Sequence, residues 1–199
     1  LGEAAVLATR NGRALGVTVR GELQAAGGVV IAAGPWTPAA GGLDLPISPL
    51  WGVVVEMELD APPTHVIEEA GVEELTGSDV PGSLFSIVTA RGISAVGSTF
   101  LPDQPDAEAL APGLIGRGAR FVPGIATARR RGLRACARPV SGDGRPLLGP
   151  LPGLQGVAVA SGHGAWGVTL GPASARLVAD GLLGRPVEIP PQLAAARFS

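Results

Sequence analysis

The stretch GVAVASGHGAWGVTLGPASARLVADGLL, residues 156–183, decides the fold class of this 199-residue chain. It opens with the apolar run 156–160, which has the length of a strand buried on both faces, as in a parallel sheet. A glycine-rich turn follows at 162–167, and residues 169–183 then predict an amphipathic helix. The predicted apolar face of that helix comprises Leu170, Ala173, Leu177, Val178 and Leu182. Strand, glycine turn and helix in this order indicate an α/β layer with a ligand-facing turn.

The turn itself spells G-x-G-x-x-G, which marks a dinucleotide site when it opens a βαβ unit. The Pro-containing tail after Gly167 holds no convincing second strand with an acidic ribose ligand, so we reject that interpretation. We still interpret the turn as a ligand-binding turn. Its backbone N–H groups and the positive end of the following helix favour an electron-rich oxygen of a phosphate or a flavin. The alternative is that the glycines only permit close packing of strand and helix.

Two hairpins are indicated elsewhere in the chain. The first pairs residues 4–9 with 14–20 around Asn11-Gly12, and the second pairs 84–89 with 93–99 around residues 90–92.

The remaining segments predict a mixture of strand, loop and helix. Strands are expected at 29–34, as a run buried on both faces, and at 51–59, with a proline- and glycine-rich loop over 36–50 between them. A helix is expected over 106–121, with Asp106 as its N-cap. Together the elements predict an α/β (α+β) fold with a nucleotide-type layer at both ends and a mixed or antiparallel layer inserted between them.

Composition narrows the function classes. Hydrophobic residues make up 46% of the chain, which predicts a packed core, and the net charge of −2 gives no basis for nucleic-acid binding. The five arginines within residues 129–138 are interpreted mainly as a solvated face. No apolar run approaches the ~20 residues of a membrane span, and the first residues do not form a signal peptide. We therefore expect a cytoplasmic protein, with no transmembrane segment and no metal site.

Three segments together carry a family resemblance: VVIAAGPWTP at 29–38, CARPVSGDGRPLLGPLPG at 136–153, and the stretch 156–184. In order and spacing they resemble the D-amino-acid oxidase-like family of FAD-dependent oxidoreductases, which includes glycine oxidase, sarcosine oxidase and D-amino-acid dehydrogenase. The resemblance implies an incomplete FAD-binding Rossmann-like domain formed by residues 1–50 and 138–199. It also implies a substrate domain on a mixed or antiparallel sheet formed by residues 51–137.

The resemblance implies removal of a hydride from the C–N bond of an amino acid or secondary amine, with FAD as cofactor. The family's pyrophosphate-binding G-x-G-x-x-G has no counterpart upstream of Ala32. We therefore expect a fragment, a truncated gene product, or a subunit that pairs with a second chain supplying the βαβ unit. The alternative function is a non-catalytic remnant or binding module that keeps the fold without flavin.

Individual residues receive roles from the same resemblance. Arg138 matches the arginine that anchors the substrate carboxylate, a role suited to a planar guanidinium fork; alternatively it caps a loop carboxylate such as Asp143. His163 is a candidate base or a hydrogen-bonding loop residue. Cys136 stands where monomeric sarcosine oxidases carry a flavin-linking cysteine, or is a small buried hydrophobe. The candidate cofactor-binding residues are Gly34, Pro35, Trp36, Trp51, Gly52, Asp143, Gly162, His163, Gly164, Trp166, Gly167 and Val168.

Overall fold

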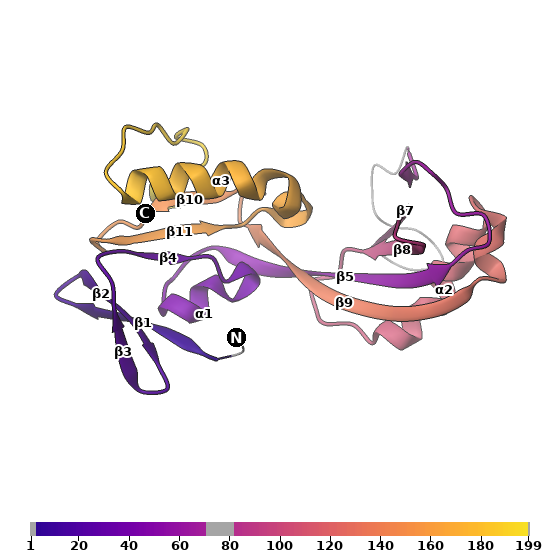
Figure 1. Ribbon diagram of the computed structural model, residues 1–199, viewed down its shortest axis with the longest axis horizontal. Helices are drawn as coiled ribbons and strands as arrows, with labels where there is room; N and C mark the ends of the chain where they lie inside the picture. The colour runs from indigo at the N-terminus through magenta and orange to yellow at the C-terminus, as the bar shows by residue number, and fades with distance from the viewer. Residues whose placement is uncertain (1–2, 71–81, 199) are drawn as a thin grey trace. The chain divides into compact units, whose positions relative to one another are not determined.

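The computed structural model describes residues 3–70 and 82–198, and the chain divides into two compact units. The first unit combines Leu1–Pro49 with Arg138–Ser199, and the second is the continuous stretch Leu50–Ala137. The boundaries fall within the long strands β5 (Ile47–Glu58) and β9 (Arg129–Ser141), which can be followed in Figure 1. No helix in the described ranges is both long enough and apolar enough to cross a membrane.

The first unit is organised around a sheet with the strand order β10–β11–β4. β11 (Val157–Ser161) runs parallel to β4 (Val29–Ile31) and antiparallel to β10 (Leu147–Pro150). The predicted parallel strands are therefore confirmed, although β4 ends at Ile31 rather than at residue 34, and Val157 and Val159 are fully buried. The expectation that 29–34 is buried on both faces is wrong, because β4 has only β11 as a described neighbour in the sheet and Val30 is 41% exposed.

Helix α3 (Gly167–Leu182) lies along β10 and β11, as Figure 1 shows. Its predicted apolar face is only partly right. Val178 is buried in a small core with Leu148 and Ala158, whereas Leu170 and Leu182 are at least a third exposed. Ala173 is also exposed. The contact with the strands covers a narrower stripe of the helix than its hydrophobic periodicity suggests.

A three-stranded antiparallel meander completes the sheets of this unit: β1 (Ala5–Arg10), β2 (Arg13–Val19) and β3 (Glu22–Ala25). The predicted hairpin is confirmed, with Asn11 and Gly12 at φ values of 52° and 71°. Arg20-Gly21 adopts the same left-handed geometry, at 52° and 82°, and creates β3, a strand that the sequence pattern does not predict. A side chain such as Arg at the first position is less typical of this turn than Asn, Asp or Gly.

The segment 36–50 is not a continuous loop as predicted. It contains the end of the short 3-10 helix η1 (Gly34–Trp36) and the helix α1 (Thr37–Gly41), and β5 begins at Ile47 rather than at residue 51. Prolines do not prevent these turns, because they lie in first turns, where the backbone N–H has no helical partner.

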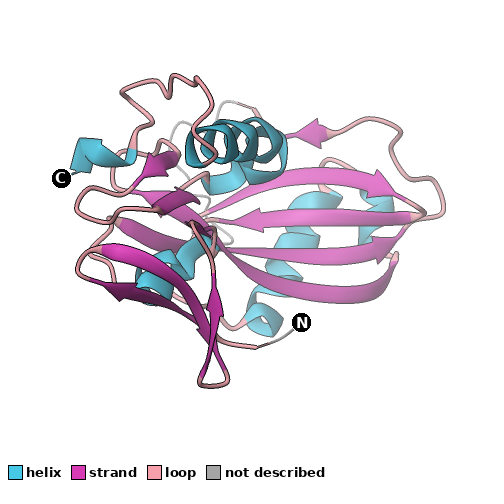
Figure 2. Cartoon of the chain, turned by 60° about the vertical axis from the view of Figure 1, so that its left-hand side comes forward, coloured by secondary structure: helices cyan, strands magenta, loops and turns pink. Residues whose placement is uncertain are grey.

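The described residues of the second unit contain the sheet order β6–β7–β8–β5–β9, and the long strands lie side by side in Figure 2. Its further strands are β6 (Ile67–Glu68), β7 (Ser83–Ala90) and β8 (Ile93–Thr99). The second predicted hairpin is confirmed, and its turn places Arg91 and Gly92 at φ values of 52° and 79°. The antiparallel β6–β7, β7–β8 and β8–β5 pairings match the predicted layer.

One helix closes the core of the second unit. The predicted Asp106 cap is confirmed: its carboxylate accepts the N–H groups of Glu108 and Ala109 at 3.0 and 3.2 Å, and α2 (Ala107–Ala119) follows. A 3-10 helix, η2 (Pro123–Ala126), then leads into β9. The core between sheet and helix is formed by buried residues that include Val53, Val55, Phe85, Val96, Leu114 and Ile125.

Candidate functional site

The parallel strands β4 and β11 end side by side in two matching turns. Register places Ile31 opposite Val159, and each strand then leads to a glycine and a 3-10 helix that ends in tryptophan, namely η1 and η3 (Gly164–Trp166). In both turns the tryptophan N–H donates to the carbonyl three residues earlier, at 3.1 Å for Trp36 and 3.0 Å for Trp166. The carboxyl ends of parallel strands are the usual ligand-facing edge of an α/β sheet, so these turns form a candidate site.

A buried hydroxyl pair ties the two turns together. Thr37 Oγ1 donates to the Gly34 carbonyl at 2.7 Å, and Ser161 Oγ reaches the same oxygen at 3.0 Å. The two hydroxyls are also 3.0 Å apart, and both residues are almost completely buried. This network fixes the Gly34 carbonyl against the end of β11, so the spacing of the two turns is set by side chains that the sequence pattern does not single out.

The outer faces of the turns are open. Gly34 and Gly164 have φ values of +58° and +55°, and a Cβ on either would meet no atom within 4 Å. Trp166 is 65% and Val168 95% exposed at the start of α3. The first turn of α3 has no side-chain cap and no acidic residue, so its N–H groups present a positive end of the helix dipole.

His163 is held within its turn. Its Nε2 lies 2.9 Å from the hydroxyl of Ser174, which is buried on α3, and its backbone bridges to Val140 on β9. Burial lowers the pKa of the His163 imidazole, which favours the neutral ring. The contact with Ser174 suits the hydrogen-bonding interpretation of this histidine, whereas the neutral ring is compatible with either role, and both roles stay predictions.

Arg138 lies two residues before Val140 on β9, and the bridge between Val140 and His163 therefore brings the strand of Arg138 to the glycine turn. Residues two apart on a strand share a face. The structure thus places Arg138 on a segment adjacent to the turn. Its role as carboxylate anchor stays a prediction.

The other arginines of this strand have acidic partners. Arg129 and Arg131 approach Glu58, Arg130 approaches Glu108, and Arg134 approaches Glu56 at 2.7 Å. All four side chains are at least two-fifths exposed. They form the solvated face expected from the sequence.

Asp143 has a partner that differs from the one considered in the sequence. Arg197 donates to both of its carboxylate oxygens, at 2.8 and 2.9 Å. The alternative role of Arg138 as a cap of this carboxylate stays a prediction. The Arg197 guanidinium holds the pKa of Asp143 far below its ordinary value. The sequence pattern does not single out Arg197, because its partner Asp143 lies 54 positions earlier in the chain.

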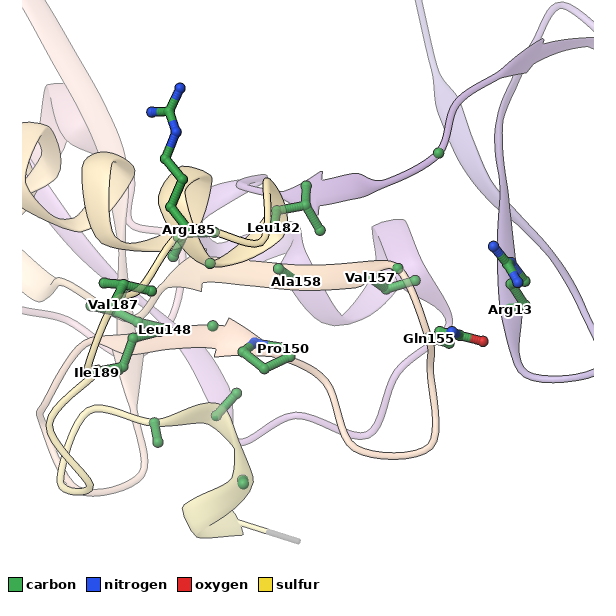
Figure 3. Close-up of a pocket in the computed structure, with 18 residues that line it drawn as sticks. Arg13, Leu148, Pro150, Gln155, Val157, Ala158, Leu182, Arg185, Val187 and Ile189 are labelled. Atoms are coloured by element: carbon green, nitrogen blue, oxygen red, sulfur yellow. The ribbon is translucent and has the colours of Figure 1, made fainter.

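A cavity of about 670 Å³ lies at the opposite end of β11 from the glycine turn (Figure 3). Its lining is mostly apolar, with Leu148, Val157 and Leu182 among its walls and Arg13, Gln155 and Arg185 as its polar side chains. None of the predicted site residues lines this cavity. The candidate site is therefore the open pair of turns rather than the cavity.

Comparison with known proteins identifies the family of the chain. Residues 2–181 match the family model described as FAD dependent oxidoreductase (DAO). The chain belongs to this family. The resemblance inferred from the three sequence segments is thereby confirmed.

Several relatives are amino-acid oxidoreductases by name. Glycine oxidase of Pseudomonas aeruginosa is 30% identical over 188 residues, which cover 90% of this chain and 48% of that protein. D-amino acid dehydrogenase of Xylella fastidiosa is 28% identical and covers 89% of this chain and 40% of that protein. The crystal structure of glycine oxidase from Geobacillus kaustophilus matches with a TM-score of 0.77 at 28% identity, over 91% of this chain and 48% of that one. The chain spans about half the length of these relatives or less.

The two turns have properties that fit the FAD of the family. Gly34 and Gly164 have no atom near the space that a Cβ would occupy, so a flat ring can approach their backbone. The free N–H groups at the uncapped start of α3 suit an electron-rich carbonyl oxygen. Among the described residues, no group of three or more His, Cys, Asp or Glu side chains is placed to hold a metal.

Trp51 and Gly52 belong to the second unit. The Trp51 N–H and carbonyl pair with Leu101 at 2.6 and 3.0 Å, and Gly52 is buried in β5. The two bonds with Leu101 account for the place of Trp51 in the strand. The predicted contact of both residues with FAD stays a prediction.

Cys136 is exposed on β9, so its interpretation as a small buried hydrophobe is wrong. An exposed position on an arginine-rich strand does not require a covalent role. We expect acid precipitation of the FAD-loaded protein to release the flavin into the supernatant, as measured by its absorbance. Flavin that stays on the precipitate, and is lost in Cys136→Ser, would establish a covalent link instead.

Proposed function

We propose that the protein to which this chain belongs is an FAD-dependent oxidase or dehydrogenase that oxidises the C–N bond of an amino acid or secondary amine. The observation that carries the proposal is the pair of open glycine–tryptophan turns at the ends of β4 and β11, with the strand of Arg138 bridged to one of them. The names of the relatives support the substrate class.

The first unit would hold the cofactor. Gly34 to Trp36 and Gly162 to Val168 supply backbone that can approach a flat ring closely, and the N–H groups at the start of α3 would stabilise negative charge on a ring oxygen. FAD, when bound, supplies the acceptor for the hydride. Trp51, Gly52 and Asp143 complete the proposed set, with Asp143 acting through the turn it stabilises.

The second unit would form most of the substrate domain, and Arg138 would bind the substrate. Its guanidinium fork suits a carboxylate, and binding the carboxylate in two places orients the Cα–H of the amine. His163 would orient the glycine turn through Ser174. A neutral substrate amine already has its lone pair available, so the proposal requires no protein base.

Anaerobic reduction of the flavin tests the proposal. The FAD-loaded protein is mixed with glycine, sarcosine and D-alanine, and the visible flavin absorbance is followed; we expect at least one carboxylate-bearing amine to bleach it. Propionate, which has the carboxylate but no amine, is the control and should leave the spectrum unreduced. A protein that takes up no flavin on reconstitution would support the non-catalytic alternative.

Residues 1–199 by themselves are expected to bind FAD weakly. The residues proposed above account for the approach to the flavin ring, and the chain covers only 48% of the glycine oxidase relative. We expect a Kd weaker than about 1 μM, which corresponds to less than ~8 kcal/mol of binding free energy. Isothermal titration of FAD into residues 1–199 measures it, and a sub-micromolar Kd would contradict the prediction.

A further inference from the structure

The last described residues are hydrogen-bonded to the turn between β9 and β10 at several atoms. Arg197 lies in the 3-10 helix η4 (Ala195–Phe198), and its Nε and Nη2 donate to the two carboxylate oxygens of Asp143 at 2.8 and 2.9 Å. Nη2 also donates to the Arg145 carbonyl at 2.9 Å. The guanidinium thus binds a side chain and a backbone group of the same turn, a bidentate geometry that lysine cannot reproduce.

The environment of Arg197 distinguishes this contact from an ordinary surface ion pair. The Arg197 side chain is only 13% exposed, its Nη1 donates to the Ala194 carbonyl at 3.2 Å, and its Cζ lies 4.5 Å from the centre of the Phe198 ring. The pair between Arg185 and Asp180 at the end of α3 has a similar shortest distance, 2.8 Å, but its arginine is 66% exposed. Low exposure and four donated hydrogen bonds make the Arg197 contact the more rigid of the two.

The turn at 141–145 lies against Gly162, the first glycine of the turn at 162–167. Asp143 also accepts the Arg145 N–H at 3.1 Å, which closes the turn, and the hydroxyl of Ser141 lies 3.1 Å from the same carboxylate oxygen. Ser141 is buried, and a Cβ on Gly162 would lie 3.1 Å from the Ser141 Cβ. Hydrogen bonds therefore link Arg197 through Asp143 to Ser141, which lies next to Gly162, and the neighbouring Val140 bridges to His163.

We propose that Arg197 is a positioning residue, which clamps the turn at 141–145 through Asp143 and thereby holds the glycine turn at 162–167 in the geometry that receives the flavin. The flavin part of this inference rests on the proposed function. The clamp itself concerns only contacts within the chain.

The charge state of the clamp follows from its geometry. Arg197 and the hydrogen bonds of the turn hold the pKa of Asp143 well below its ordinary value, so the carboxylate is ionised at neutral pH. A lowered folded-state pKa contributes stability above the pKa of the unfolded carboxyl, and that contribution is lost as the pH falls through the folded value. The clamp is therefore closed throughout the neutral range.

Hydrogen exchange in the full protein without flavin tests the clamp. In Arg197→Lys we expect the amides of residues 162–167 to exchange about tenfold faster, the size expected when a charge-assisted hydrogen bond is lost. Asp143→Asn should give the same pattern, and the double variant should add little to either change. Arg185→Lys, in the pair with Asp180, is the matched control and should leave these amides within about twofold of the wild type.

Flavin affinity extends the test to the site. In the reconstituted protein, Arg197→Lys should weaken FAD binding about tenfold, with Arg185→Lys again unchanged. Faster exchange confined to 142–146 and 195–198, or spread equally into α2 of the second unit, would overturn the proposal, since the contact would then be local or merely stabilising. A wild-type protein that binds no flavin would refute the proposed function while the exchange result still decided the clamp.

Discussion

Replacement of Arg138 by lysine is expected to lower kcat/KM for a carboxylate-bearing amine by about ten- to a hundredfold, because lysine keeps the charge but loses the guanidinium fork. Arg138 lies on the part of β9 that is bridged to the glycine turn through Val140 and His163, so its strand is close to where the flavin is proposed to bind. Steady-state kinetics of the FAD-loaded Arg138→Lys variant measures the loss.

Two controls separate substrate anchoring from a general defect. A decarboxylated analogue gives the fork nothing to hold, so its turnover should barely change, and the flavin content of the variant should equal that of the wild type. Arg131→Lys, on the exposed face near Glu58, should leave both substrates unaffected. Equal losses on both substrates, or loss of flavin, would assign Arg138 a structural role and leave the carboxylate anchor unassigned.

Replacement of Arg117 by methionine is expected to destabilise the second unit by about 3 kcal/mol. Arg117 is 6% exposed on α2, donates to Glu69 Oε2 from Nε and Nη2 at 2.9 and 2.8 Å, and reaches the Ser83 hydroxyl at 3.3 Å. Removing the guanidinium leaves the Glu69 carboxylate, whose side chain is 19% exposed, without the cation that donates hydrogen bonds to it, and only the charge of Arg120 remains nearby. Urea denaturation followed by circular dichroism gives the change in the free energy of unfolding.

The pair of Arg117 and Glu69 also makes the stability of the fold depend on pH in the acidic range. Burial by itself raises the pKa of Glu69, but the Phe85 N–H and the Arg117 guanidinium outweigh it, and the net pKa is lowered. The pair therefore stabilises the fold above the pKa of an unfolded glutamate, ~4.3, and this contribution is lost as the pH falls through the lowered value. Arg117→Met should therefore lose less stability than the wild type as the pH falls below ~4.3.

An exposed ion pair supplies the matched control. Arg130→Met removes the partner of Glu108, where the arginine is 42% and the glutamate 67% exposed, and should leave the free energy of unfolding close to that of the wild type. A Glu69→Gln, Arg117→Met double variant should recover part of the loss, because no uncompensated charge remains. If Arg117→Met were as mild as Arg130→Met, the buried pair would contribute little to the fold.

Local signals in the sequence predicted several elements well. Asn11-Gly12 fixes its hairpin because both residues must adopt left-handed backbone, and Asp106 starts α2 because its carboxylate satisfies two free N–H groups. The apolar run at 157–159 is buried as expected of a central strand.

Some features that depend on distant partners were not predicted. β9 is rich in arginine and contains Gly132, and it is a strand because it pairs at the end of the second unit's sheet, where its charged side chains reach water and Glu56 or Glu58. The pair of Arg197 and Asp143 joins residues far apart in the sequence, and only the fold brings them together. The narrow buried face of α3 likewise depends on which strands the helix meets.

The hydroxyl pair that ties the two turns also constrains the order in which the chain can fold. Ser161 and the Gly34 carbonyl it reaches are 127 positions apart, whereas the second unit is a continuous segment between them. Because the ribosome adds ~5–20 residues per second, the second turn is synthesised about 6–25 seconds after the first. The second unit can therefore form its core first, while the strand β4 waits without its parallel neighbour. Binding of a chaperone to the nascent chain would be most valuable during that interval, at the apolar run around Val30.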